Sequence, residues 1–236
     1  VVVTGLVSVF LIPEPELAPR KEPYLKTLIY GLRPSVVKEN PALYLAFAAF
    51  CLFSVAVQVF FPYLIIYMQN YLHFDGYALV LGIVLIFASV VSVLSGRVID
   101  RLGQLRCVLP AAAVMFVGLI GMFFARAMAA VIAAGCVMMS GYMLITAILS
   151  GIIRDKTPAG TAGQFQGIRM LFGVLLPMIL GPAIGAAVIR GSDSTYVDLG
   201  VVKTVPTPSI FLAAAAVLLL ILPPVLLLRK KEGAKC

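Results

Sequence analysis

The chain has 236 residues, of which 62% are hydrophobic and only 12% are charged, and its mean hydropathy is +1.09. A soluble domain is about half apolar and about a quarter charged, and a core of this size could not hide so much apolar surface. The composition therefore excludes a soluble domain, a disordered chain and a disulfide scaffold. Despite the net charge of +8, it also argues against a nucleic-acid-binding domain.

The first forty residues do not contain a complete span. Residues 1–12 are apolar but too short to cross a bilayer, and we expect them to be the truncated end of a preceding transmembrane helix, so that the chain is a fragment. Residues 13–41 are expected to form a cytoplasmic linker. Four prolines keep its first half irregular, and Pro23 to Arg33 has the spacing of a short amphipathic helix lying in the membrane interface.

Six stretches are long enough to cross a bilayer, which takes about 20 apolar residues as a helix. They are Ala42 to Met68, Tyr77 to Ser95, two within Cys107 to Ile153, Ile168 to Ile189, and Ser209 to Leu228. As a single helix, the run from Cys107 to Ile153 would be about 70 Å long, so we predict that it forms two helices joined by a turn at residues 125–127. Residues 42–228 should thus form an all-α, six-helix transmembrane bundle, followed by a cytoplasmic tail at 229–236.

The distribution of basic residues predicts the orientation of this bundle. One side holds Arg126, Arg190 and Lys203, and the other side holds the remaining 15 of the 18 lysines and arginines. Under the positive-inside rule the side with 15 is cytoplasmic. We therefore expect an integral protein of the plasma (inner) membrane, in contact with lipid, with both termini in the cytoplasm and with no nucleic-acid partner.

No acidic or basic residue lies near the centre of a predicted span. Charges at that depth mark ion pathways and proton relays, so these residues offer no site for coupling to protons or metal cations. The single histidine, His73, is read as a solvated loop residue. Motifs of the H-E-x-x-H and G-x-S-x-G kinds are also missing from the sequence. The chain is therefore not expected to be an enzyme, and no metal or cofactor is predicted.

The most informative motif is the predicted cytoplasmic turn between the second and third spans, with the sequence GRVIDRLGQLR over residues 96–106. Asp100 could accept hydrogen bonds from free N–H groups at a helix start, and Gly103 permits a turn with positive φ. Arg101 and Arg106 could hold the helix ends in the interface. Gly96, Asp100, Arg101 and Gly103 resemble the loop signature G-x-x-x-D-R-x-G-R-R of the major facilitator superfamily, whereas residues 104 and 105 depart from its basic pair.

This resemblance implies a fold of two six-helix bundles joined by a long cytoplasmic loop. The chain looks like the carboxy-terminal half of that fold, which implies a missing amino-terminal six-helix half as its partner. The segment Glu39 to Pro41 and the predicted loop from Arg154 to Arg169 are similar to the sugar and cation symporter branch.

Small residues and prolines recur along the fifth span. Gly173, Pro177, Gly181 and Gly185 are spaced by four residues and share one helix face, and Pro182 adds a second break. Such a face permits close helix packing. The alternative is a bending element in a transporter that works by rocking of its bundles.

Polar groups at membrane depth are the candidates for contact with a solute, because they are costly to bury. We single out five of them: Gln58, Tyr63, Tyr67, Tyr142 and Thr146. Gln58 is the strongest, either as a cavity-lining group or in an interhelical hydrogen bond, whereas a Ser or Thr hydroxyl can bond back to its own helix.

These features predict a secondary active transporter that moves a small polar solute, such as a sugar, by alternating access. The alternative is a non-catalytic six-helix membrane assembly or a channel subunit.

Overall fold

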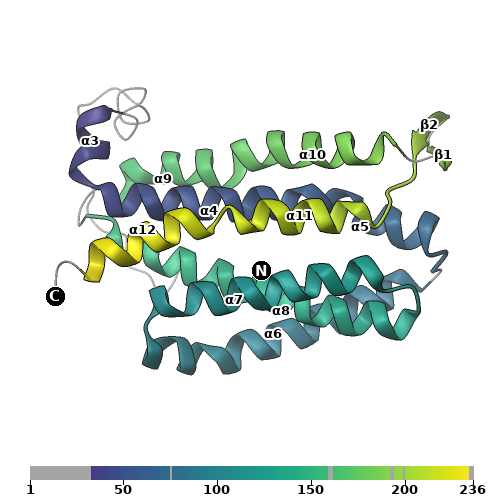
Figure 1. The fold of residues 1–236 in the computed structure, drawn as a ribbon, viewed down its shortest axis with the longest axis horizontal. Coiled ribbons are helices and arrows are strands. Elements are labelled where there is room, and N and C mark those ends of the chain that lie inside the picture. Colours follow the sequence, from purple (N-terminus) through teal and green to yellow (C-terminus); the bar gives the residue numbers. More distant parts are fainter. Residues whose placement is uncertain (1–32, 75, 159–161, 192–193, 199, 234–236) are drawn as a thin grey trace, which may run out of the picture.

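The computed structural model describes residues 33–74, 76–158, 162–191, 194–198 and 200–233 (Figure 1). Within them, six helices are long and apolar enough to cross a membrane. These spans are Pro41–Tyr71, Tyr77–Leu102, Gln104–Phe124, Met128–Lys156, Gly163–Ile189 and Ser209–Glu232. The predicted all-α bundle of six spans and its hairpin turn at residues 125–127 are confirmed. The expected helix end at residues 1–12 and nearly all of the expected amphipathic helix at Pro23 to Arg33 lie outside the described residues.

The spans are built from shorter elements. In chain order these are α3 (Pro34–Glu39), α4 (Pro41–Phe60), the 3₁₀ turn η1 (Phe61–Tyr63), α5 (Leu64–Ile66), the π-helical turn η2 (Tyr67–Tyr71), α6 (Tyr77–Leu102), α7 (Gln104–Phe124), α8 (Met128–Lys156), α9 (Ala162–Met170), the π-helical turn η3 (Leu171–Leu175), α10 (Leu176–Ile189), β1 (Thr195–Asp198), β2 (Val201–Thr204), α11 (Ser209–Leu219) and α12 (Leu222–Gly233).

Prolines account for three of the interruptions, because each one removes the N–H that would bond the carbonyl four residues earlier. Pro62 leaves the Gln58 carbonyl without its helical donor, and the first span narrows to η1 there. Pro177 likewise leaves the carbonyl of Gly173 without its helical donor, and Gly173 lies within the π-helical turn η3. The pair at 223–224 follows the break between α11 and α12.

Several predicted boundaries are wrong. The second span continues to Leu102 instead of ending at Ser95, so most of the signature motif is helical and only Gly103 forms the turn. Because residues 96–102 contain no proline, the helix continues through the membrane interface until a residue with positive φ ends it. The expected loop from Arg154 to Arg169 is also mostly helical, since only residues 157–161 separate α8 from α9.

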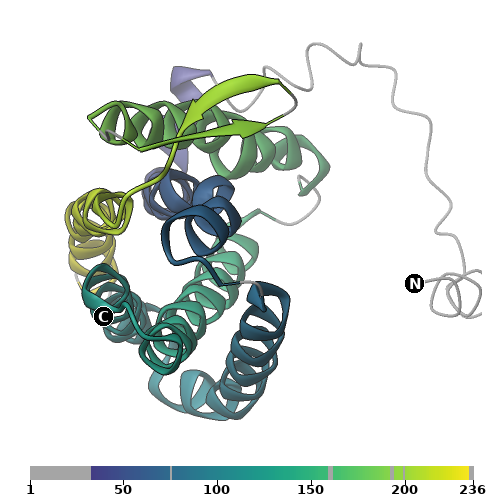
Figure 2. The same ribbon diagram turned by 90° about the vertical axis from the view of Figure 1, so that its right-hand side faces the viewer.

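The spans form an arc around α4. α4 contacts α8, α10, α11 and α12, while α7 and α8 form a closely packed hairpin. Viewed along the bundle, α6 and α10 lie at opposite ends of the arc (Figure 2). These two helices are also the least covered by the rest of the bundle. In the apolar segment of each span, 17% of the residues are buried in the second span and 22% in the fifth, against 56% in the first. Both therefore present wide apolar faces that no other described helix covers.

The two ends of the bundle differ in charge. One end, here called the basic end, carries the turn between α6 and α7, the last turn of α8 and the last turn of α12 (Figure 1). The opposite end carries the antiparallel hairpin of β1 and β2 and is here called the hairpin end. The sequence analysis missed this hairpin, although β-branched residues on both sides of Gly200, which has a φ of 80°, are a hairpin signal.

Candidate functional site

The glycines of the fifth span lie directly against the first span. A Cβ atom placed on Gly181 would lie 2.3 Å from the Cβ of Gln58, and one on Gly185 would lie 2.6 Å from the carbonyl oxygen of Val59. One on Gly173 would lie 2.5 Å from the ring of Phe50. Real Cβ atoms do not lie this close to other heavy atoms, so the first and fifth spans approach as closely as they do only because these positions lack side chains.

Two of the predicted solute contacts lie at this α4–α10 contact. Gln58 is half-buried, and its Cβ packs on Gly181. No hydrogen bond joins its amide to another residue within the described parts of the chain. The hydroxyl of Tyr63 donates a hydrogen bond to the carbonyl oxygen of Pro182 at 3.0 Å. The structure therefore links a predicted solute contact to a predicted bending residue, and Pro177 is buried one turn earlier in the same helix.

Tyr67 points to a different side of the bundle. Its side chain is fully buried, with ring centroids 5.1 Å from Tyr71 and 5.2 Å from Phe211. Its hydroxyl has no hydrogen-bond partner among the described residues. The guanidinium of Arg126 lies 5.7 Å from the centre of the Tyr71 ring and donates to the carbonyl oxygens of Phe123 and Ala125. Tyr67 thus packs among aromatic side chains at the hairpin end.

The two candidates on the fourth span are engaged within the bundle. Tyr142 stacks on Phe53 with ring centroids 5.8 Å apart. The hydroxyl of Thr146 donates to the Tyr142 carbonyl at 2.8 Å, the bond to the preceding helical turn that the sequence analysis allowed for. The five predicted contact residues thus have different neighbours within the bundle.

A small apolar cavity was missed by the sequence analysis. It encloses about 140 Å³ between the end of the first span and helices α6, α7 and α8. Four methionines line it: Met68, Met122, Met138 and Met139. Methionine is flexible and polarisable, and it adapts to ligands of different shape. No pattern of the sequence pointed to this cavity, because the methionines come from three different spans.

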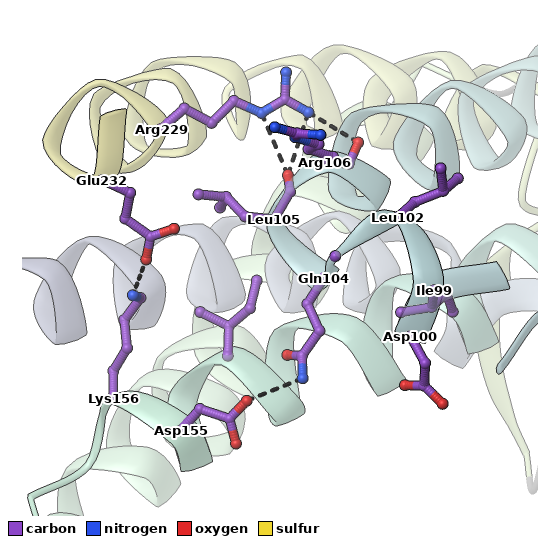
Figure 3. Close-up of a pocket in the computed structure, with 12 residues that line it drawn as sticks. Ile99, Asp100, Leu102, Gln104, Leu105, Arg106, Asp155, Lys156, Arg229 and Glu232 are labelled. Carbon is purple, nitrogen blue, oxygen red and sulfur yellow. Dashed lines mark hydrogen bonds and ion pairs between the residues drawn. The ribbon is translucent and has the colours of Figure 1, made fainter. Parts of the chain in front are cut away.

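A larger cavity of about 810 Å³ lies at the basic end, beside the signature turn (Figure 3). Gly103 has a φ of 87°, as the sequence analysis expected for a turn glycine. Asp100 lines this cavity but makes no hydrogen bond or ion pair with a described residue, so its predicted bond to a helix start is not seen. Arg101 and Arg106 are exposed at the same turn, and Gly96 has open space around its Cα.

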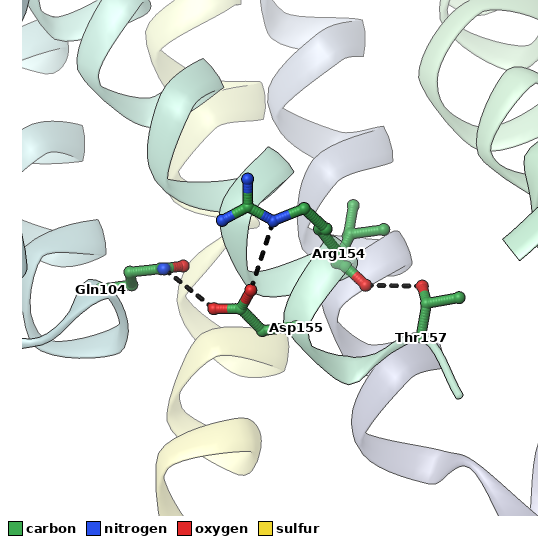
Figure 4. Close-up of polar contacts among 5 residues, drawn as sticks. Gln104, Arg154, Asp155 and Thr157 are labelled. Atoms are coloured by element: carbon green, nitrogen blue, oxygen red, sulfur yellow. Dashed lines mark hydrogen bonds and ion pairs between the residues drawn. The ribbon is translucent and has the colours of Figure 1, made fainter. Parts of the chain in front are cut away.

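Polar contacts tie three helix ends together around this cavity. Gln104 donates to the Asp155 carboxylate at 3.0 Å, and Arg154 reaches the other oxygen of that carboxylate at 3.4 Å (Figure 4). Lys156 forms an ion pair with Glu232. Gln104 stands where the family signature has a basic residue, and here it joins the start of α7 to the end of α8.

Arg229 supports the same end from α12. Its guanidinium donates to the carbonyl oxygen of Arg106 at 2.9 Å and to that of Leu105 at 3.2 Å (Figure 3). The Arg106 carbonyl would normally bond the N–H of residue 110, but that residue is Pro110 and has none. Arg229 therefore supplies a donor that the proline removed. The described residues hold no cluster of three or more His, Cys, Asp or Glu that could bind a metal ion.

The comparisons with known proteins agree with these features. The model of the Major Facilitator Superfamily matches residues 1–182, which include the whole signature turn. The chain therefore belongs to the major facilitator superfamily, a family of membrane transporters and not of enzymes, and it is an integral membrane protein. It is also similar to the multidrug transporter QDR2 of Candida glabrata, with 29% identity over an alignment of 188 residues that covers 75% of this chain. The chain spans 31% of the length of that relative.

Proposed function

We propose that the chain is the carboxy-terminal six-helix half of a secondary transporter that moves a small organic solute by alternating access. The family match supports a transporter, and the sparse burial of α6 and α10 supports a second bundle as their partner. In this proposal residues 13–41 connect the two halves on the cytoplasmic side. Six further apolar spans are then expected upstream of Val1 in the source DNA, and a start codon just before Val1 would favour the alternative, a six-helix membrane assembly or channel subunit.

The methionine-lined cavity favours an apolar or amphipathic solute over a sugar, and its volume of about 140 Å³ has room for only part of a drug-sized molecule. It is lined almost entirely by apolar side chains, among them four methionines, whereas the polar candidates other than Gln58 bond to or stack on other residues of the bundle. The name of the similar multidrug transporter agrees with such a solute class. Apolar pockets of this kind bind by burial of surface and discriminate weakly between shapes.

A polar solute remains the second candidate. Gln58 is the observation that favours it, because its amide is half-buried at membrane depth and has no hydrogen-bond partner among the described residues. A sugar hydroxyl could bond that amide, in keeping with the resemblance to the sugar and cation symporter branch.

A crossed substitution experiment separates the two solute classes. Cells that express the protein together with the proposed upstream half are given either the dye Nile red or a radiolabelled hexose, and the movement of each compound across the membrane is measured. If the solute is apolar, Met139→Ala should raise the apparent KM for the dye about tenfold, while Gln58→Met, which keeps a linear side chain against Gly181, should leave it unchanged. The volume-conserving Met139→Leu is the matched control.

The opposite pattern would support the polar solute. The apolar proposal would be overturned if hexose is transported and its transport is lost in Gln58→Met but unchanged in Met139→Ala. If neither compound is transported faster than in cells that lack the protein, the result favours the alternative of a six-helix membrane assembly. Surface expression and thermal unfolding of each variant in detergent separate loss of transport from loss of folding.

A further inference from the structure

The methionine-lined cavity has walls of two kinds. Most of its lining residues are buried, among them Met122 and Met138. Three are exposed: Phe61 and Ile65 at the end of the first span by 49% and 44%, and Leu85 of α6 by 42%. Because the exposed lining residues come from these two elements alone, the cavity has an opening between the end of the first span and α6.

The packing of α6 agrees with an opening on this side. α6 packs along α8 and also contacts α7. A Cβ atom on Gly135 of α8 would lie 3.1 Å from the Cγ2 of Val84, so the two helices lie close together where both line the cavity. Within the described chain, α6 has no comparable packing on the first span. The wall between these two elements is therefore the weakly closed one.

The opening lies at the depth of the lipid tails. In α6, the uncharged run from Tyr77 to Gly96 is about 30 Å long as a helix, which matches the hydrocarbon thickness of a bilayer. The lining residues of this helix, from Val80 to Leu85, lie about 5–12 Å from the start of the run. The opening therefore faces the acyl chains of the leaflet at the hairpin end.

The chemistry of the lining suits a hydrocarbon chain. None of the described residues that line the cavity has a charged, hydroxyl or amide side chain, so a polar group inside would lose its hydrogen bonds to water without replacement. The four methionines have flexible side chains that adapt to the shape of an occupant. The volume of about 140 Å³ accommodates the end of a chain and not a whole lipid.

The second bundle of the proposed function can cover α6 without closing this opening. Ile86, Val90 and Val93 are spaced by four and three residues and form one strongly exposed face of α6. Leu81 and Leu85 are also four residues apart, so they share another edge of the helix, and both line the cavity. A helix packed on the first of these faces leaves the edge beside the first span open to lipid.

From these observations we propose that the methionine-lined cavity is a lateral pocket that takes the end of a lipid acyl chain from the leaflet at the hairpin end. The chain enters between Phe61, Ile65 and Leu85 and lies against the methionines. In one respect this inference rests on the proposed function: an apolar solute reaches the cavity from the bilayer through the same opening and displaces the lipid chain.

The test uses the protein together with its proposed upstream half, in nanodiscs of a phosphatidylcholine that carries a diazirine at the middle of one acyl chain. Irradiation should attach this lipid to Met122, Met138 or Met139, as detected by mass spectrometry of peptides, although these side chains are buried. Leu85→Trp fills the opening with a larger side chain and should abolish this labelling. Leu79→Trp is the matched control, because Leu79 is an exposed leucine of the same helix that does not line the cavity.

Two results would overturn the lateral pocket. One is attachment of the lipid to exposed residues of the spans and to none of the four methionines. The other is equal labelling of the methionines in Leu85→Trp and Leu79→Trp, with thermal unfolding of both variants unchanged from the parent.

Nile red transport by the same variants tests the proposed function separately, because labelling does not require transport. If Leu85→Trp loses the methionine labelling and also raises the apparent KM for the dye, the solute uses the same opening as the lipid chain. If the labelling is lost while the apparent KM is unchanged, the lipid pocket stands and the cavity is not the solute site.

Discussion

At the scale of single residues, a side chain at the basic end donates to a backbone carbonyl that a proline leaves without its helical donor. Pro110 deprives the Arg106 carbonyl of its helical donor, and the Arg229 guanidinium occupies that place from a helix more than a hundred residues further along the chain. A hydrogen bond from a charged donor contributes about 1.5–3 kcal/mol, and the value is at the low end here because the bond to Arg106 is exposed. Arg229 is therefore a structural residue of this end, although its position among other basic residues looks like an ordinary membrane flank.

This relation predicts a specific coupling. Arg229→Ala should lower the free energy of unfolding by about 1–2 kcal/mol, measured by denaturant titration in detergent, whereas Lys230→Ala, at an exposed neighbour, should change it little. In a Pro110→Ala background, residue 110 regains its N–H and the cost of Arg229→Ala should shrink. Equal costs in both backgrounds would mean that Arg229 acts through something other than the Arg106 carbonyl.

At the scale of elements, the hairpin of α7 and α8 depends on two glycines that the sequence analysis did not single out. A Cβ atom on Gly118 would lie 2.3 Å from the backbone nitrogen of Met138, and one on Gly141 would lie 2.4 Å from that of Met115. The two contacts are reciprocal, as expected for antiparallel helices that cross at close range. Because the obstacle is backbone and not a flexible side chain, the helices would have to separate to admit a methyl group.

Gly118→Ala should therefore destabilise the bundle, although alanine is the better helix former. We expect a loss of about 1–3 kcal/mol from overpacking, against a gain of about 1 kcal/mol in helix propensity. Gly82→Ala in α6 is the matched control, since nothing lies within 4 Å of its added Cβ, and it should be neutral or stabilising. A Gly118→Ala protein that unfolds at or above the parental temperature would contradict the close crossing.

The fifth span gives a second prediction at this scale, for the proposed bending element. Pro182→Ala restores a helical donor and should stiffen α10, so transport should slow while thermal stability holds or rises. The Tyr63 hydroxyl donates to the backbone carbonyl of residue 182, so this bond survives the substitution and the experiment isolates helix stiffness. Unchanged transport rates would leave the glycines and prolines of this span with a packing role alone.

At the scale of the whole molecule, the separation of charge between the two ends predicts the topology. In a variant without native cysteines, Ser194→Cys at the hairpin end should react with a membrane-impermeant maleimide in intact cells. Lys230→Cys at the basic end should react only after the cells are opened, because the positive-inside rule holds that end in the cytoplasm. The reverse labelling pattern would invert the orientation and place the hairpin end inside the cell.

The sequence by itself determined the class of protein, the six spans, the hairpin turn at residues 125–127 and the separation of charge between the ends. These features follow from local properties: the transfer of apolar runs into lipid, the length of a helix across a bilayer, and the conformations of glycine and proline. The signature turn was recognised for the same reason, because its residues act at fixed offsets along one stretch of chain. Gly103 has the positive φ expected of it, even though the helix before it proved longer than predicted.

Only the tertiary structure decided which side chains meet. The spans are apolar on nearly every face, so periodicity could not tell a face that packs on another helix from one that contacts lipid. Gln58 and Tyr67 were both predicted solute contacts, yet Gln58 packs on Gly181 while Tyr67 packs on Tyr71 and Phe211. The methionine-lined cavity likewise requires helices far apart in the chain to lie together, and that arrangement depends on how the spans fit against one another.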